Sequence, residues 1–130
     1  MTDFKYISTD RSPQPMGPYS LGVAFGGMVV TAGQLPIDPD TNQIVDGGIT
    51  EQTRQCIRNL QAVLEAGGTT LDRVVKLTVF LTNMDDLVAV ADVRKEFWND
   101  PHPISTTVES PRLANPKALI EIDVLAVTAD

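Results

Sequence analysis

The chain has 130 residues, of which 42% are hydrophobic and 21% charged, and its formal net charge is −7. This length and balance predict one globular domain, residues 1–130, with a single hydrophobic core. The acidic charge argues against the basic surface that nucleic-acid binding needs, and no apolar run approaches the ~18 residues that span a bilayer. We therefore expect neither a nucleic-acid nor a membrane partner.

The N-terminal residues lack a basic region followed by an apolar stretch, so the sequence indicates no signal peptide. Cys56 is the single cysteine and cannot form an intramolecular disulfide, which is typical of a reducing compartment. Together these features predict a cytoplasmic protein. With one histidine and one cysteine, no His/Cys metal cluster is expected.

The first half of the chain predicts a hairpin, a loop and a helix. Residues 19–33 form the hairpin, because Gly26-Gly27 tolerates the positive φ angles of a two-residue turn. Residues 34–49 are rich in Pro, Asp and Gly and predict an ordered loop rather than a helix or strand. Thr50 is expected to cap a helix that ends at Gly67-Gly68.

The second half predicts three more strands around a second helix. Residues 75–81 alternate in polarity with the period of a strand, and Asn83 is expected to cap a helix that stops before Pro101. Two strands follow, over 104–110 and 119–127. Two helices and five or six strands predict an α+β layer with both helices packed on one face of the sheet.

The predicted strands are apolar on both of their faces. Leu77 and Phe80 point to opposite sides of one strand, as do Leu125 and Ala126 of another. If the helices cover one face, the other needs a partner, so the pattern predicts an oligomer without fixing its size.

Few residues are candidates for chemistry. Glu121 and Asp123 point to one face of the last strand, either as solvated surface acids or as carboxylates in a partly apolar cleft with a raised pKa. His102, between two prolines, is interpreted as a solvated loop residue rather than a catalytic one. Cys56 lies on the apolar face of the first helix and favours a buried role, and Arg112 favours structural pairing over substrate clamping.

Several short motifs, in order, resemble one family. They are Gly17-Pro18-Tyr19-Ser20, Ala32-Gly33-Gln34-Leu35-Pro36, Gln52-Thr53-Arg54-Gln55, residues 59–68, residues 74–81, Arg112-Leu113 and Ile120-Glu121-Ile122-Asp123. Spanning roughly residues 17–127, this set is similar to the RidA (YjgF, L-PSP) family of enamine/imine deaminases. The resemblance implies a chorismate-mutase-like mixed sheet backed by two helices, in a homotrimer with clefts between subunits.

The resemblance also implies a chemistry. Family members hydrolyse reactive enamines and imines, small molecules such as 2-aminoacrylate, to 2-keto acids and ammonia without a cofactor or metal. Carried over, Glu121 is the catalytic acid that positions water. Tyr19 lines the cleft, Ala32 and Gly33 offer backbone groups to the substrate, and Thr107 lies where the family often has cysteine.

Ser105 is the main departure from the family pattern. The matching residue is normally an arginine that binds the substrate carboxylate, and Ala91 also stands where many members have asparagine. A guanidinium–carboxylate contact in a partly desolvated site is worth on the order of 2–4 kcal/mol, or about 30- to 1000-fold in affinity. Another cation, Arg112 or Lys117, would have to reach the cleft, or the ligand would have to lack a carboxylate at that end.

The sequence therefore supports three functional hypotheses. The first is a RidA-like hydrolase acting on an imine, enamine or related small metabolite, with an altered substrate preference. The second is a non-catalytic metabolite-binding or regulatory protein on the same trimeric scaffold. A ribonuclease or translation inhibitor is disfavoured by the acidic charge and the single histidine.

Overall fold

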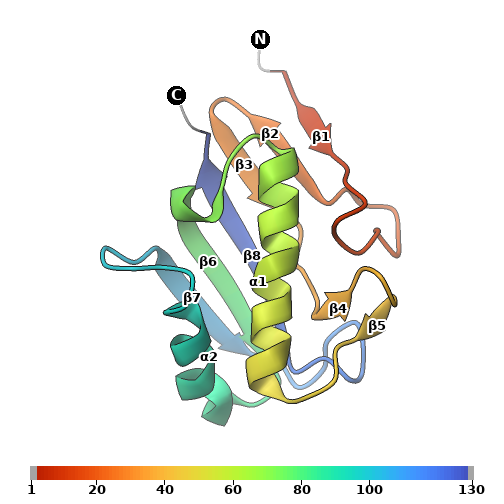
Figure 1. Cartoon of the computed structure of the whole chain (residues 1–130), viewed down its shortest axis with the longest axis vertical. Helices are drawn as coiled ribbons and strands as arrows, with labels where there is room; N and C mark the ends of the chain where they lie inside the picture. The colour runs from red at the N-terminus through yellow and green to blue at the C-terminus, as the bar shows by residue number, and fades with distance from the viewer. Residues whose placement is uncertain (1–2, 129–130) are drawn as a thin grey trace.

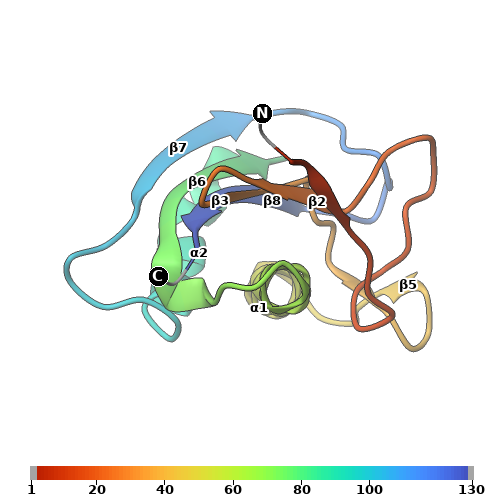
Figure 2. The same cartoon turned by 90° about the horizontal axis from the view of Figure 1, so that it is seen from above.

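The computed structural model describes residues 3–128, which form a six-stranded sheet and two α-helices. The sheet order is β1-β2-β3-β8-β6-β7, and only the β6–β7 pair is parallel. The elements of this layer are β1 (Lys5–Ile7), β2 (Gly22–Phe25), β3 (Met28–Thr31), α1 (Ile49–Ala66), β6 (Val74–Leu81), α2 (Leu87–Arg94), β7 (Ile104–Glu109) and β8 (Ile120–Val127). Both helices lie on one side of the sheet (Figure 2). The predicted α+β class with a mixed sheet is confirmed.

The predicted hairpin is present as β2 and β3. Gly26 and Gly27 have φ angles of 54° and 78°, values that glycine adopts without steric cost. The first arm begins at Gly22 rather than Tyr19, since residues 19–21 do not pair with another strand. Strand β1, which the sequence pattern did not predict, adds to the far side of β2 (Figure 1).

Helix α1 is the long amphipathic helix that the sequence predicted, with a different cap. It begins at Ile49, and Gly48 rather than Thr50 is the N-cap residue. The Gly48 amide donates to Glu51 Oε2 at 3.1 Å, which satisfies one of the free amides of the first turn. At the other end, Gly68 takes the left-handed conformation with a φ of 90°.

The segment between β3 and α1 differs from the predicted ordered loop, because part of it forms regular structure. It contains two short paired strands, β4 (Ile37–Asp38) and β5 (Gln43–Ile44). Buried Asn59 of α1 fixes this segment by donating to the carbonyls of Leu35 and Ile37, at 3.1 and 2.9 Å. These two hydrogen bonds give the carbonyls of Leu35 and Ile37 a partner inside the protein.

Short 3₁₀ turns precede β6 and α2, namely η1 (Leu71–Arg73) and η2 (Met84–Asp86). Asn83 caps the second turn by accepting from the Asp85 amide at 2.9 Å, whereas the N-cap residue of α2 itself is Asp86 and not Asn83 as predicted. Helix α2 ends at Arg94, earlier than expected. Trp98 follows it, and its buried indole donates to the Leu71 carbonyl at 2.7 Å.

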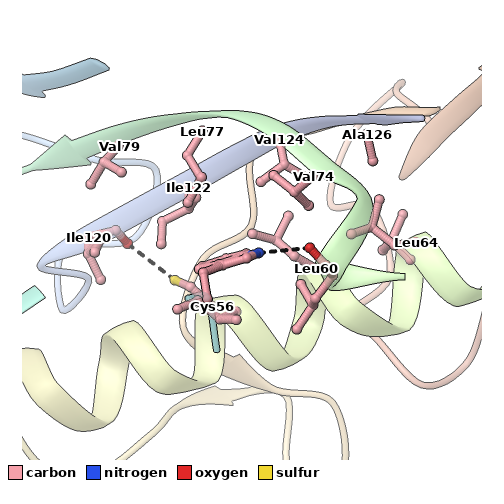
Figure 3. Packing of buried hydrophobic residues seen from close by; sticks show 14 of the residues in the cluster. Cys56, Leu60, Leu64, Val74, Leu77, Val79, Ile120, Ile122, Val124 and Ala126 are labelled. Carbon is pink, nitrogen blue, oxygen red and sulfur yellow. Dashed lines mark hydrogen bonds between the residues drawn. The ribbon is translucent and has the colours of Figure 1, made fainter. Parts of the chain in front are cut away.

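The core lies between α1, α2 and the sheet (Figure 3). Alternate residues of β8 enter it, and Ile120, Ile122 and Ala126 have no exposed surface. This confirms the predicted inward face of β8. None of the helices within residues 3–128 is long and apolar enough to cross a membrane.

The face of the sheet away from the helices is partly apolar and uncovered in a single chain. Tyr6 and Ile104 are each 67% exposed and Val108 is 42% exposed, while Phe80 is half-buried. We call this surface the open face. The predicted sheet with apolar side chains on both faces is confirmed, and a hydrophobic surface of this kind is typical of a protein–protein contact.

Candidate functional site

Glu121 lies on β8 with its side chain on the open face. Its neighbours Ile120 and Ile122 are fully buried beneath the helices, so strand alternation turns Glu121 the other way. Gly33 lies next to it, because a Cβ added to Gly33 would stand 2.8 Å from Glu121 Cδ. The missing side chain at position 33 therefore leaves the room that the carboxylate occupies.

The segment that carries Gly33 is fixed to β8 by backbone hydrogen bonds. Gln34 exchanges two backbone hydrogen bonds with Ile122, at 2.8 and 3.2 Å. Tyr19 and Gly33 line the same narrow pocket, and the Tyr19 hydroxyl accepts from the Met16 amide at 3.2 Å. Gly33 therefore shares a pocket with Tyr19 and also adjoins the Glu121 side chain.

Ala32, also predicted to offer backbone groups, does so only in part. Its amide already donates to the Leu21 carbonyl at 2.8 Å. A ligand at this point would therefore find the carbonyl of Ala32, an acceptor, rather than its N–H group.

The protein environment makes Glu121 a stronger base than an ordinary carboxylate. Burial raises the pKa of Glu121 above the ordinary value of a glutamate, and the nearby Asp123 charge raises it further. Burial also raises the pKa of Asp123, but a hydrogen bond from Thr78 and the charge of Lys76 work against that shift. Of the two candidate acids, Glu121 is the one with no group that stabilises its charge, which suits a proton acceptor.

A second group of candidate residues lies on β7 and faces α2. Ser105 and Thr107 are in parallel register with the buried residues Leu77 and Val79, so they point to the helix side. Two hydrogen bonds confirm that direction: Arg94 Nη1 donates to Ser105 Oγ at 2.9 Å, and the Met84 amide donates to Glu109 Oε1 at 2.8 Å.

Within one chain the two groups are on opposite sides of the sheet. The open face carries Glu121, while Ser105 and Thr107 lie on the helix side of the edge strand β7. A single chain therefore does not bring all the predicted site residues into one cleft.

Comparison with known proteins assigns the family. The family model described as Endoribonuclease L-PSP matches residues 9–128. The chain belongs to the L-PSP family. The 2-iminobutanoate/2-iminopropanoate deaminase of Dermatophagoides farinae is 40% identical over 127 residues, which are 98% of each chain.

Solved structures of L-PSP-like proteins have the same fold. YyfA of Yersinia pestis, from the conserved Rid protein family, superposes with a TM-score of 0.92 at 38% identity, over 97% of this chain and 100% of that one. E. coli TdcF with bound serine superposes with a TM-score of 0.89 at 34% identity, over 96% and 99%. The resemblance inferred from the sequence motifs is thereby confirmed at the level of the family.

In this L-PSP protein, Arg112 lies neither with Glu121 on the open face nor with Ser105 and Thr107 on β7. It is exposed in the loop after β7 and lines a separate pocket of about 240 Å³ with Leu113 and Asn115. Lys117 is also exposed, and its carbonyl accepts from the Gln52 side chain at 3.0 Å. The cation beside Ser105 is instead Arg94, which sequence reasoning missed.

A signal for Arg94 was present in the chain. Arg94 follows Ala91 by three residues, so the two lie on the same face of the helix. Ala91 is the position at which many family members have asparagine.

The other two candidates behave as their structural interpretations predicted. Cys56 is fully buried, and burial raises the pKa of its thiol well above the ordinary value of a cysteine, which disfavours the reactive thiolate. His102 is an exposed loop residue, although it also lines a pocket with Arg94. Residues 3–128 contain no group of three or more His, Cys, Asp or Glu side chains placed to hold a metal ion.

Proposed function

We propose that the protein is a deaminase that hydrolyses small enamines or imines bearing a carboxylate. The half-buried Glu121 carboxylate above Gly33 is the observation that carries this proposal. Membership of the L-PSP family and similarity to a 2-iminobutanoate/2-iminopropanoate deaminase support it.

The reaction requires little from the protein. A protonated imine carbon is already electrophilic, so Glu121 needs only to orient a water molecule and accept its proton as the C–O bond forms. The resulting amino alcohol collapses when the same proton reaches nitrogen: the C–N bond breaks, and the hydroxyl proton passes through Glu121 to the released ammonia as the C=O bond forms. Water and the imine are consumed, and a 2-keto acid and ammonia are released.

We further propose that the working site forms between copies of the chain in a homotrimer. Glu121 lies on the open face, whereas Ser105 lies on the helix side of the edge strand. The two come together if the β7 edge of one copy packs against the open face of the next. If this head-to-tail contact repeats around a threefold axis, three copies form a closed ring. The contact would also cover the exposed side chains of Tyr6 and Ile104.

The test is an imine-trapping assay. An amino-acid oxidase generates 2-iminopropanoate or 2-iminobutanoate, semicarbazide traps it, and the protein is expected to reduce the trapped fraction by speeding hydrolysis. Absence of any acceleration across a panel of imino acids contradicts the deaminase function. Ligand-dependent thermal shifts in that case would favour a metabolite-binding protein. Light scattering should give the mass of three chains.

Gly33→Ala is expected to lower deaminase activity about 10- to 100-fold while leaving the fold intact. The new methyl group would overlap the end of the Glu121 side chain, which is flexible enough to swing aside. The carboxylate would then be displaced from the position at which it orients water. The measurement is kcat/KM in the trapping assay, with thermal melting as the check on folding.

Gly48→Ala is the matched control, because a Cβ at Gly48 would meet no atom within 4 Å. It introduces the same methyl group away from Glu121, and we expect activity close to that of the wild type. Equal activity of the two variants would show that Gly33 does not reserve space for the catalytic carboxylate.

A further inference from the structure

Arg94 is the arginine of the second group of residues, at the end of α2. Its side chain is half-buried, and Nη1 donates to Ser105 Oγ at 2.9 Å. Within residues 3–128, ion pairs join Arg11 to Glu65 and Arg54 to Glu96, at 3.0 and 2.7 Å, but none reaches Arg94. Its guanidinium is therefore held by a neutral hydroxyl and has no anionic partner in the described chain.

A pocket of about 250 Å³ opens beside this guanidinium. Ala91, Arg94, Lys95 and His102 line it, so three of its four side chains carry nitrogen donors. Lys95 is only loosely paired with Asp92, at 3.8 Å and largely exposed. Ala91 contributes just a methyl group, which leaves space in front of Arg94. The pocket is thus small and cationic.

The electrostatics of Arg94 favour an anion in that space. Burial lowers the pKa of the Arg94 guanidinium below its ordinary value, yet an arginine remains charged at neutral pH. A partly desolvated cation gains more from a counter-charge than an exposed one, because water screens the interaction less. The guanidinium has five N–H donors, and Ser105 uses one of them.

We propose that Arg94 binds the carboxylate of the substrate and that Ser105 orients its guanidinium for that contact. A planar guanidinium and a carboxylate form two parallel hydrogen bonds, which the free edge of Arg94 can supply. The resemblance implies an arginine at position 105 of β7. In this chain the arginine is instead Arg94 of α2, whose side chain extends to Ser105 on that strand. That the bound carboxylate belongs to a substrate rests on the deaminase function proposed above. That Arg94 binds a carboxylate does not depend on it.

Binding of 2-oxobutanoate, the keto acid that deamination of 2-iminobutanoate would yield, tests the proposal without catalysis. Isothermal titration calorimetry of the intact protein should show that Arg94→Ala weakens binding about 30- to 1000-fold, as expected for a lost guanidinium–carboxylate contact in a partly desolvated site. Arg94→Lys keeps the charge but loses the paired geometry, so an intermediate affinity is expected. Arg58→Ala, which removes an exposed arginine of α1, is the charge-matched control and should bind as the wild type does.

A relocation variant provides the rescue. Arg94→Ala combined with Ser105→Arg puts the guanidinium back on β7, and we expect it to recover binding that Arg94→Ala alone loses. Ser105→Ala should weaken binding less than tenfold, because it removes the orienting hydroxyl and leaves the charge. Circular dichroism melts check that each variant remains folded.

The outcomes separate this proposal from the deaminase function. Wild-type binding of 2-oxobutanoate that Arg94→Ala and Arg94→Lys leave unchanged overturns the role of Arg94, whatever the activity. Absence of wild-type binding overturns it as well. Binding that depends on Arg94 in a protein that hydrolyses no imine upholds the carboxylate site and rejects the deaminase.

Discussion

Glu121→Gln is expected to lower kcat/KM for 2-iminopropanoate by about 100- to 10,000-fold, the range that general acid–base groups contribute. Glutamine keeps the size and the hydrogen-bonding oxygen of the side chain but accepts no proton. KM should change much less than kcat, because the substrate carboxylate is bound elsewhere. The imine-trapping assay with purified variant measures both.

Asp123→Asn is the matched variant on the same face of β8. It removes a carboxylate whose charge helps to raise the Glu121 pKa, and it leaves Glu121 itself in place. A loss well below that of Glu121→Gln is expected. If Asp123→Asn were the more damaging change, the assignment of the water-positioning acid to Glu121 would be wrong.

The same Glu121→Gln variant should also be more stable than the wild type at neutral pH. A carboxyl whose pKa is higher in the folded state binds more protons folded than unfolded, so its stabilising contribution decreases as pH rises. The cost of the buried charge is fully present above the folded pKa and absent below the unfolded value near 4.5. Thermal melts from pH 4 to 8 should show a gain for the variant at pH 7 that disappears at the acid end.

The proposed division of the site between copies makes Glu121→Gln useful in a mixture. Random trimers of Glu121→Gln and Arg94→Ala chains would restore about a quarter of the clefts, since each cleft would take one residue from each of two neighbours. Both variants are poorly active alone, so recovered activity is easy to detect. A mixture no more active than its components would contradict a cleft that takes Glu121 from one copy and Arg94 from the next.

Ile122→Ala is expected to destabilise the protein by about 2–5 kcal/mol, the range for deleting the bulk of a buried isoleucine. Ile122 has no exposed surface and lies between β8 and α1 (Figure 3). It is also the residue whose backbone exchanges hydrogen bonds with Gln34, so relaxation around the cavity would disturb the segment that carries Gly33. Urea unfolding at a fixed protein concentration measures the change, since oligomers depend on concentration.

Val88→Ala is the control for this prediction. Val88 lies on α2 with 73% of its surface exposed, and surface substitutions of this kind change stability by about 0.5 kcal/mol or less. A loss for Ile122→Ala no greater than for Val88→Ala would mean that the core around β8 repacks without a cavity.

The long helix and strands were predictable because the spacing of apolar residues within each one indicates its type. Helix α1 runs for 18 residues and β6 and β8 for 8 each, long enough for a period of 3.6 or 2 to be unmistakable. Strands β4 and β5 have only 2 residues, too few for any period, and a tertiary hydrogen bond from Asn59 of α1 to the Ile37 carbonyl holds β4. The N-cap was misplaced because Gly48 caps through backbone and a Glu51 contact, without a side chain of its own.

The sequence by itself determined the family, the α+β layer and the face on which Glu121 points, since strand alternation is a local property. The tertiary structure decided which residues meet. Gly33 lies beneath Glu121 because the segment that carries it pairs with β8, and Arg94 reaches Ser105 because α2 packs beside β7. Such contacts follow from strand register and helix docking, which depend on the whole core and leave no trace in local periodicity. For that reason the serine at position 105 suggested a missing cation, and only the fold showed an arginine beside it.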